Sequence, residues 1–173
     1  MNNYIAVPLT YDASTLLNIL DISDTSVVPC QTSTIVQIHD MLGLSVSIQS
    51  ILYFRLQPTE CSPIHIDKNL SSKNVGSSFA LNLPLLNSDN VLMKWYSDND
   101  PNINHDIFVG PNGTLTPSLP NNRVTCTDQL YYTNPHIVKI DAWHSVQNES
   151  ISDVAHFISI RFYLPLSTVM NMF

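Results

Sequence analysis

The chain has 173 residues, of which 44% are hydrophobic and 12% charged, a composition typical of one globular domain and not of a disordered chain. Its net charge of −7 disfavours nucleic acid as a partner, because phosphate binding depends on Lys and Arg. No apolar run approaches the ~20 residues that span a bilayer, and the N-terminal residues lack a basic leader. We therefore expect a soluble, cytoplasmic protein with no membrane partner.

The first quarter of the sequence favours helices. Residues 12–21 place apolar side chains at helical spacing behind an Asp and a Ser that can cap the first turn. Residues 33–43 show a second such pattern, which ends at Gly43, a residue type that commonly terminates helices. We expect residues 1–44 to form a helical extension of the single domain that spans residues 1–173.

The remainder of the chain has the character of β-strands. Alternating, β-branched and aromatic segments occur at residues 45–58, 78–86, 90–97, 136–143 and 156–166. Because no helical segments alternate with these strands, the pattern predicts a mainly β sandwich or closed barrel over residues 45–165.

Residues 97–128 contain many turn-forming residues, including Pro101, Gly110 and Gly113. A segment of this length is uncommon as a passive connection within a compact domain. We expect it to form a lid or a binding loop.

His65 and Asp67 are the first candidate site residues. In an extended segment, side chains two residues apart leave the same face, so this imidazole and this carboxylate can converge on one cation. Ile64 and Ile66 would then pack on the opposite face. A hydrogen-bonded His–Asp pair with a purely structural role is the alternative interpretation.

His144 is the candidate for a third ligand. It lies near the end of the expected strand at residues 136–143, where a barrel would bring it beside the earlier strand. Two His and one carboxylate with open coordination positions form the facial triad of non-haem Fe(II) oxygenases. Polar groups behind the ligands, Ser145 and Asn148 among them, are candidates for orienting the rings.

The order of these elements resembles the iron(II)- and 2-oxoglutarate-dependent oxygenase superfamily, in particular its small stand-alone bacterial and phage members. The resemblance rests on the sequence Ile-His-Ile-Asp, on the following strands and on the late His144, and it covers residues 45–165. It implies a double-stranded β-helix, the cupin-like jelly roll, with iron held by His65, Asp67 and His144.

The resemblance also implies a cation that binds the distal carboxylate of 2-oxoglutarate. Arg161 is the match, with Ser159 on the same strand face, and an Arg can meet a carboxylate with two hydrogen bonds. In many members this Arg follows the distal His more closely, where the present chain has Val154, Ala155 and His156. Arg55 and Lys139 therefore remain alternatives to Arg161.

Other residues of the strands are compatible with two roles each. Asn82 resembles an Asn that small members carry on the strand after the His-x-Asp motif, and it either binds the cosubstrate or satisfies the backbone. Four aromatic residues are candidates for the substrate mouth or for core packing: Trp95, Tyr96, Tyr131 and Tyr132.

The resulting functional hypothesis is an oxygenase that uses Fe(II), O2 and 2-oxoglutarate to hydroxylate a C–H bond of a peptide residue or small molecule, with release of succinate and CO2. One alternative is a jelly-roll binding or structural protein without catalysis. Another is a cupin-type metalloenzyme that does not use 2-oxoglutarate.

Overall fold

The protein is mainly β, with two antiparallel sheets and few helices. A computed structural model describes residues 3–20, 27–67, 78–102, 104–110, 115–163 and 166–171. These residues form, in order, β1 (Tyr4–Ala6), α1 (Ala13–Ile19), β2 (Val27–Pro29), α2 (Thr32–Leu42), β3 (Ile48–Leu56), β4 (Ile64–His65), β5 (Phe79–Leu86), the 3-10 helix η1 (Ser88–Asn90), β6 (Val91–Asp98), β7 (Asp106–Val109), β8 (Leu115–Leu119), the 3-10 helix η2 (Asn121–Arg123), β9 (Val124–Tyr131), β10 (His136–Lys139), β11 (His144–Asn148), β12 (Ala155–Phe162) and α3 (Leu166–Met170). Within the described ranges, no helix combines the length and apolarity needed to cross a membrane.

The strands divide into two sheets of six within the described part of the chain. The first sheet has the order β1-β10-β5-β12-β3-β2, and the second has the order β7-β8-β4-β11-β6-β9. From β3 to β6 the chain enters the two sheets alternately, and from β9 to β12 it does so again in the reverse order. Strands far apart in sequence, such as β3 and β12, therefore become neighbours.

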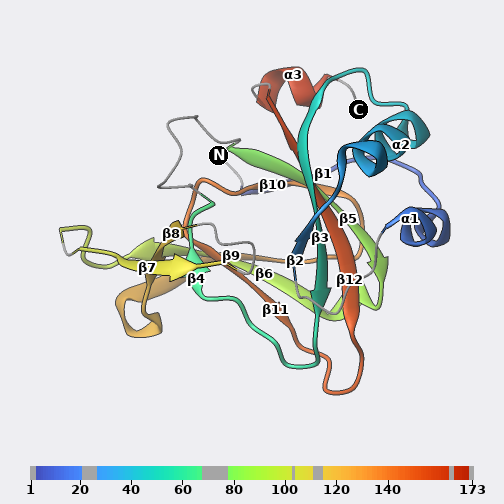
Figure 1. Cartoon of the computed structure of the whole chain (residues 1–173). Helices are drawn as coiled ribbons and strands as arrows, with labels where there is room; N and C mark the ends of the chain where they lie inside the picture. Colours follow the sequence, from blue (N-terminus) through green and yellow to red (C-terminus); the bar gives the residue numbers. More distant parts are fainter. Residues whose placement is uncertain are drawn as a thin grey trace.

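One face of the first sheet is covered by helices, and we call it the helix-covered face. Along β12, Ile158 and Ile160 point to this face and are fully buried. They pack in one apolar cluster with Leu16 of α1 and Ile38 of α2. Figure 1 shows both helices beside β3, β5 and β12, on the side away from β4 and β11. Burial of apolar side chains on alternate strand positions explains why these strands form.

The opposite face of the first sheet looks toward the second sheet, and we call it the cavity face. A second apolar cluster fills part of the space between the sheets and includes Met93, Trp95, Val138 and Phe157. The rest of that space is a cavity of about 600 Å³. Side chains alternate along a strand, so the β12 residues on either side of Ile158 and Ile160 point into the space between the sheets. These residues are Phe157, Ser159 and Arg161.

The two helices occur where the sequence predicts them. Asp12 caps α1 by accepting a hydrogen bond from the Ser14 backbone N–H at 3.0 Å. Gly43 ends α2 with a left-handed φ of 59°, a conformation that glycine adopts at little cost. The expectation of helices alone in residues 1–44 is wrong, because β1 pairs with β10 and β2 pairs with β3.

Two further expectations need correction. The strand expected at residues 136–143 ends at Lys139, and a turn then carries the chain from the first sheet to the second, so that His144 begins β11. The segment 97–128, expected to form a lid or a binding loop, consists largely of paired strands: β7 pairs with β8, and β9 pairs with β6. Residues 103 and 111–114 of that segment lie outside the described residues.

Candidate metal centre

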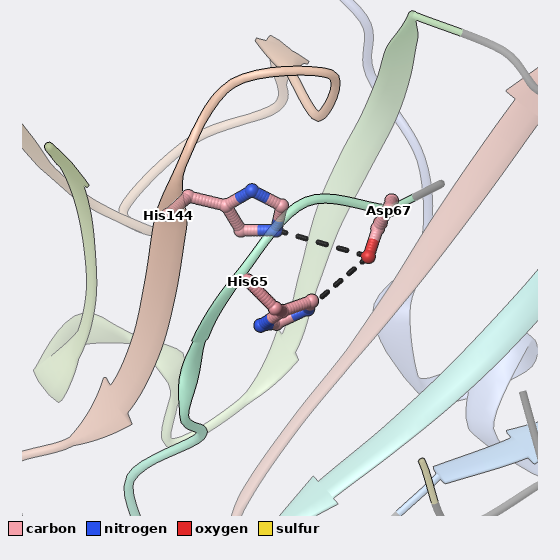
Figure 2. A group of neighbouring side chains, drawn as sticks. All are labelled: His65, Asp67 and His144. Carbon is pink, nitrogen blue, oxygen red and sulfur yellow. Dashed lines mark ion pairs between the residues drawn. The ribbon is translucent and has the colours of Figure 1, made fainter. Parts of the chain in front are cut away.

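The His and Asp side chains singled out in the sequence meet at one end of the cavity. His65 on β4 and His144 on β11 are directly opposite each other in the antiparallel pair, and their rings are 4.6 Å apart between centroids. Asp67 follows β4, and its backbone N–H donates to the Ile140 carbonyl at 3.0 Å. Figure 2 shows the three side chains pointing toward one another. One potential ligand atom from each lies within 4.8 Å of the others.

The hydrogen bonds around the two rings direct their Nε2 atoms at Asp67. His65 Nδ1 lies 2.7 Å from the Pro63 carbonyl, and His144 Nδ1 lies 2.8 Å from the Ala142 carbonyl. A carbonyl only accepts, so each Nδ1 carries the proton and each Nε2 of a neutral ring has a free lone pair. The Asp67 Oδ1 lies 3.1 Å from His65 Nε2 and 3.9 Å from His144 Nε2.

A cation between the three converging lone pairs would relieve their mutual repulsion. For a proton on His65, burial is unfavourable, but the hydrogen bond to Asp67 and the charge of Asp67 together outweigh burial and raise the pKa of His65. Burial and repulsion from His65 lower the pKa of His144 to about 4, so this ring stays neutral. A divalent metal ion fits the same donor set, because two neutral imidazole nitrogens and one carboxylate oxygen are common ligands of such ions.

The second oxygen of the Asp67 carboxylate faces Arg161. Its Oδ2 accepts a hydrogen bond of 2.6 Å from Nη2 of Arg161, which lies on β12 in the facing sheet. Burial opposes ionisation of Asp67, but Arg161 and the two imidazoles outweigh it and hold the pKa of Asp67 well below its usual range. Asp67 is therefore a carboxylate at neutral pH, as a metal ligand must be.

The other two residues proposed for the cosubstrate also line the cavity. Ser159 and Asn82 are cross-strand partners on β12 and β5, and both are buried. Asn82 donates from Nδ2 to the Tyr132 hydroxyl at 2.6 Å, and its Oδ1 is buried without a hydrogen-bond partner. The Nδ2 of Asn82 thus bonds a side chain, and its Oδ1 is left without a partner. Of the two roles considered for Asn82, satisfying the backbone is not observed among these bonds.

The alternatives to Arg161 lie elsewhere. Among the described residues that line the cavity, Arg161 is present, whereas Arg55 and Lys139 are not. The Lys139 ammonium instead lies 3.9 Å from a carboxylate oxygen of Asp141. The geometry thus favours Arg161 as the lining cation.

Ser145 and Asn148 do not orient the His rings. Ser145 hydrogen-bonds the Tyr96 hydroxyl at 2.9 Å, and Asn148 Nδ2 lies within hydrogen-bonding distance of the Leu56, Gln57 and Asp153 carbonyls. Backbone carbonyls of Pro63 and Ala142 take the role instead, each two residues before its ring. Sequence alone does not reveal this, because any residue can supply a carbonyl.

The expected substrate-mouth aromatics differ in position. Tyr132 lines the cavity, whereas Trp95 is buried in the core and donates from Nε1 to the Lys139 carbonyl at 2.8 Å. Phe108 of β7, which the sequence did not single out, also lines the cavity, and its ring centroid lies 5.9 Å from that of His65. No signal marked Phe108, because turn-forming residues surround its short strand.

The His65, Asp67 and His144 group has the donor chemistry and the convergence to hold a metal ion. No protein-family model matches the chain, and no curated protein matches it in sequence.

Proposed function

We propose that the protein is an Fe(II)- and 2-oxoglutarate-dependent oxygenase that hydroxylates a C–H bond of a peptide residue or a small molecule. The observation that carries this proposal is the convergence of His65 Nε2, His144 Nε2 and Asp67 Oδ1 at the wall of a cavity. Two imidazoles and one carboxylate leave open coordination positions on an octahedral metal, as in the non-haem Fe(II) oxygenases.

The strand order supports a double-stranded β-helix, or cupin-like jelly roll. Eight strands, four per sheet, form two alternating runs, β3 to β6 and β9 to β12. Of these strands, β3, β5, β10 and β12 lie in the first sheet, and β4, β6, β9 and β11 lie in the second. The two candidate His ligands lie on neighbouring strands of the second sheet, Asp67 follows β4, and Arg161 lies on the facing sheet. This arrangement agrees with the resemblance noted from the sequence.

When bound, Fe(II) with 2-oxoglutarate supplies O2 activation coupled to decarboxylation, which yields succinate, CO2 and the hydroxylated product. The chain supplies the remaining elements. His65, His144 and Asp67 hold the metal, while Arg161 provides positive charge for a carboxylate inside the cavity. Apolar lining residues, including Leu52, Phe54, Leu56, Met93, Val146 and Phe157, limit the access of water.

A second candidate function is a cupin-type metalloenzyme that does not use 2-oxoglutarate. The 2.6 Å contact between Arg161 and Asp67 favours it, because this cation is already paired. The wall that β3 and β11 contribute to the cavity is largely apolar and offers no described cation in its place.

The test is a measurement of succinate formation by anaerobically purified protein supplied with Fe(II), 2-oxoglutarate and O2. We expect succinate that depends on both Fe(II) and the intact triad, so that His65→Ala and Asp67→Ala abolish it. Ile107→Ala, an exposed position on β7, is the matched control and should retain it. Succinate formation retained in both ligand variants would refute the proposed site.

A thermal unfolding measurement separates the second candidate function from the first. Mn(II) replaces Fe(II) in a thermal unfolding measurement, since it binds similar ligands without consuming O2. Stabilisation by Mn(II) that 2-oxoglutarate does not increase would favour the cupin-type enzyme. A ligand present at 100 times its Kd adds about 2.7 kcal/mol to the free energy of unfolding, which is readily measured.

A further inference from the structure

Arg161 and the metal ligands share one carboxylate. Asp67 directs Oδ1 to the two His Nε2 atoms and Oδ2 to Arg161 Nη2, which lies at 2.6 Å. The Asp67 side chain is 15% exposed and that of Arg161 is 20% exposed, so water screens this pair only in part. A cation bound at Oδ1 therefore changes the strength of the ion pair between Oδ2 and Arg161.

Arg161 retains unused hydrogen-bonding capacity. Its Nε is buried without a hydrogen-bond partner. Arg161 lines the cavity together with Ser159. An anion placed there would meet a guanidinium that has several donors, and a charge-assisted bond of this kind is among the stronger ones in proteins.

We propose that the Asp67–Arg161 ion pair couples metal binding to the binding of a carboxylate-bearing ligand in the cavity. In the metal-free protein, Asp67 holds Arg161. A divalent ion at Oδ1 takes up the negative charge of Asp67, weakens the ion pair and releases Arg161 for the ligand. The coupling rests on the proposed metal centre, and it must be reciprocal, so the ligand also increases the affinity for the metal.

The probe for this coupling is glutarate, which carries two carboxylates but lacks the keto group needed to chelate a metal. Co(II) is titrated calorimetrically into metal-free protein, with and without saturating glutarate. Coupling between sites usually changes affinity about 5- to 150-fold, and we expect glutarate to tighten Co(II) binding by about tenfold.

Arg161→Gln separates the ion pair from direct binding of glutarate to the metal. In this variant we expect Co(II) to bind and the effect of glutarate to disappear. Lys139→Gln is the matched control, because Lys139 does not line the cavity, and it should keep the full effect. An equal effect of glutarate in Arg161→Gln would overturn the proposal.

Asp67→Asn tests the same idea without a metal. The substitution removes the charge that holds Arg161, so metal-free Asp67→Asn should bind glutarate about tenfold more tightly than metal-free wild type. Circular dichroism establishes that the variant is folded. Unchanged or weaker glutarate binding by the folded variant would overturn the proposal.

The outcomes also distinguish this proposal from the proposed function. Co(II) binding by wild type that glutarate does not affect would overturn the coupling and leave the metal centre in place. Failure of wild type to bind Co(II) would overturn both.

Discussion

The two faces of the first sheet differ in chemistry although the same strands build them. On the helix-covered face, β12 contributes Ile158 and Ile160, which are buried against α1 and α2. On the cavity face, the alternate residues of the same strand include Ser159 and Arg161. The period of two in a β-strand thus separates the residues that stabilise the fold from those that form the site. Substitutions one position apart should therefore have different consequences.

Removal of a candidate metal ligand at the cavity should have the largest effect, a loss of metal affinity. We expect His144→Ala to weaken divalent metal binding by more than the roughly 10- to 100-fold that loss of a residue behind a ligand costs. The variant should remain folded, since the apolar clusters are intact. Calorimetric titration with Co(II) measures the affinity, and near-wild-type affinity in this variant would contradict the assignment of His144.

Residues 158 and 159 provide the sharpest comparison of the two faces. Ile158→Ala removes a fully buried side chain and should lower the free energy of unfolding by about 2–5 kcal/mol. Ser159→Ala, at the next position, deletes one hydroxyl at the cavity and should cost less than about 1 kcal/mol. Urea unfolding measures both, and equal losses would show that the two faces are not energetically distinct.

The pH dependence of stability should reflect the buried histidines. Burial lowers the pKa of His136 and His156, and burial with repulsion from His65 lowers that of His144 to about 4. Below about pH 6.5 the unfolded chain therefore binds protons that the folded chain does not. The free energy of unfolding consequently decreases as the pH is lowered. The raised pKa of His65 acts in another window: its contribution is complete below about pH 6.5 and is lost as the pH rises.

For metal-free protein, His144 alone should lower the free energy of unfolding by about 2 kcal/mol between pH 6.5 and 5. Urea unfolding at several pH values measures this slope. His144→Gln should reduce it, whereas an unchanged slope would place the titrating groups elsewhere.

The smallest expected effect lies in the helical layer. Gly43 has a φ of 59°, and a Cβ at this position would meet no heavy atom within 4 Å. Gly43→Ala should therefore cost only the left-handed backbone strain, about 1 kcal/mol, and leave metal binding unchanged. A loss several times larger would indicate a packing role that the structure does not show.

The sequence predicts those parts of the fold whose signals are local. Alternating apolar residues identified β3, β5, β6 and β12, and Gly43 marked the end of α2. The spacing of His65 and Asp67 was sufficient to predict that their side chains converge, because side-chain direction in an extended segment depends only on sequence separation. The pairing of β4 with β11 places His144 beside these two residues. The order of the elements in the sequence suggested that these two strands would be neighbours.

Features that depend on distant partners were not predictable. The short strands β1, β2, β7 and β8 are at or near sheet edges, and their pairing depends on other strands more than on their own sequences. The Arg161–Asp67 ion pair joins residues 94 positions apart and is fixed by the register of β12 against β5 and β3. His144 was placed at the wrong end of a strand, because nothing local marked the turn after Lys139.

The central claim is that His65, Asp67 and His144 bind one metal ion. The most direct measurement is anomalous diffraction at the iron absorption edge from crystals grown anaerobically with Fe(II). We expect a single peak between His65 Nε2, His144 Nε2 and Asp67 Oδ1. A map without a peak at this position, or with its strongest peak at another site, would contradict it.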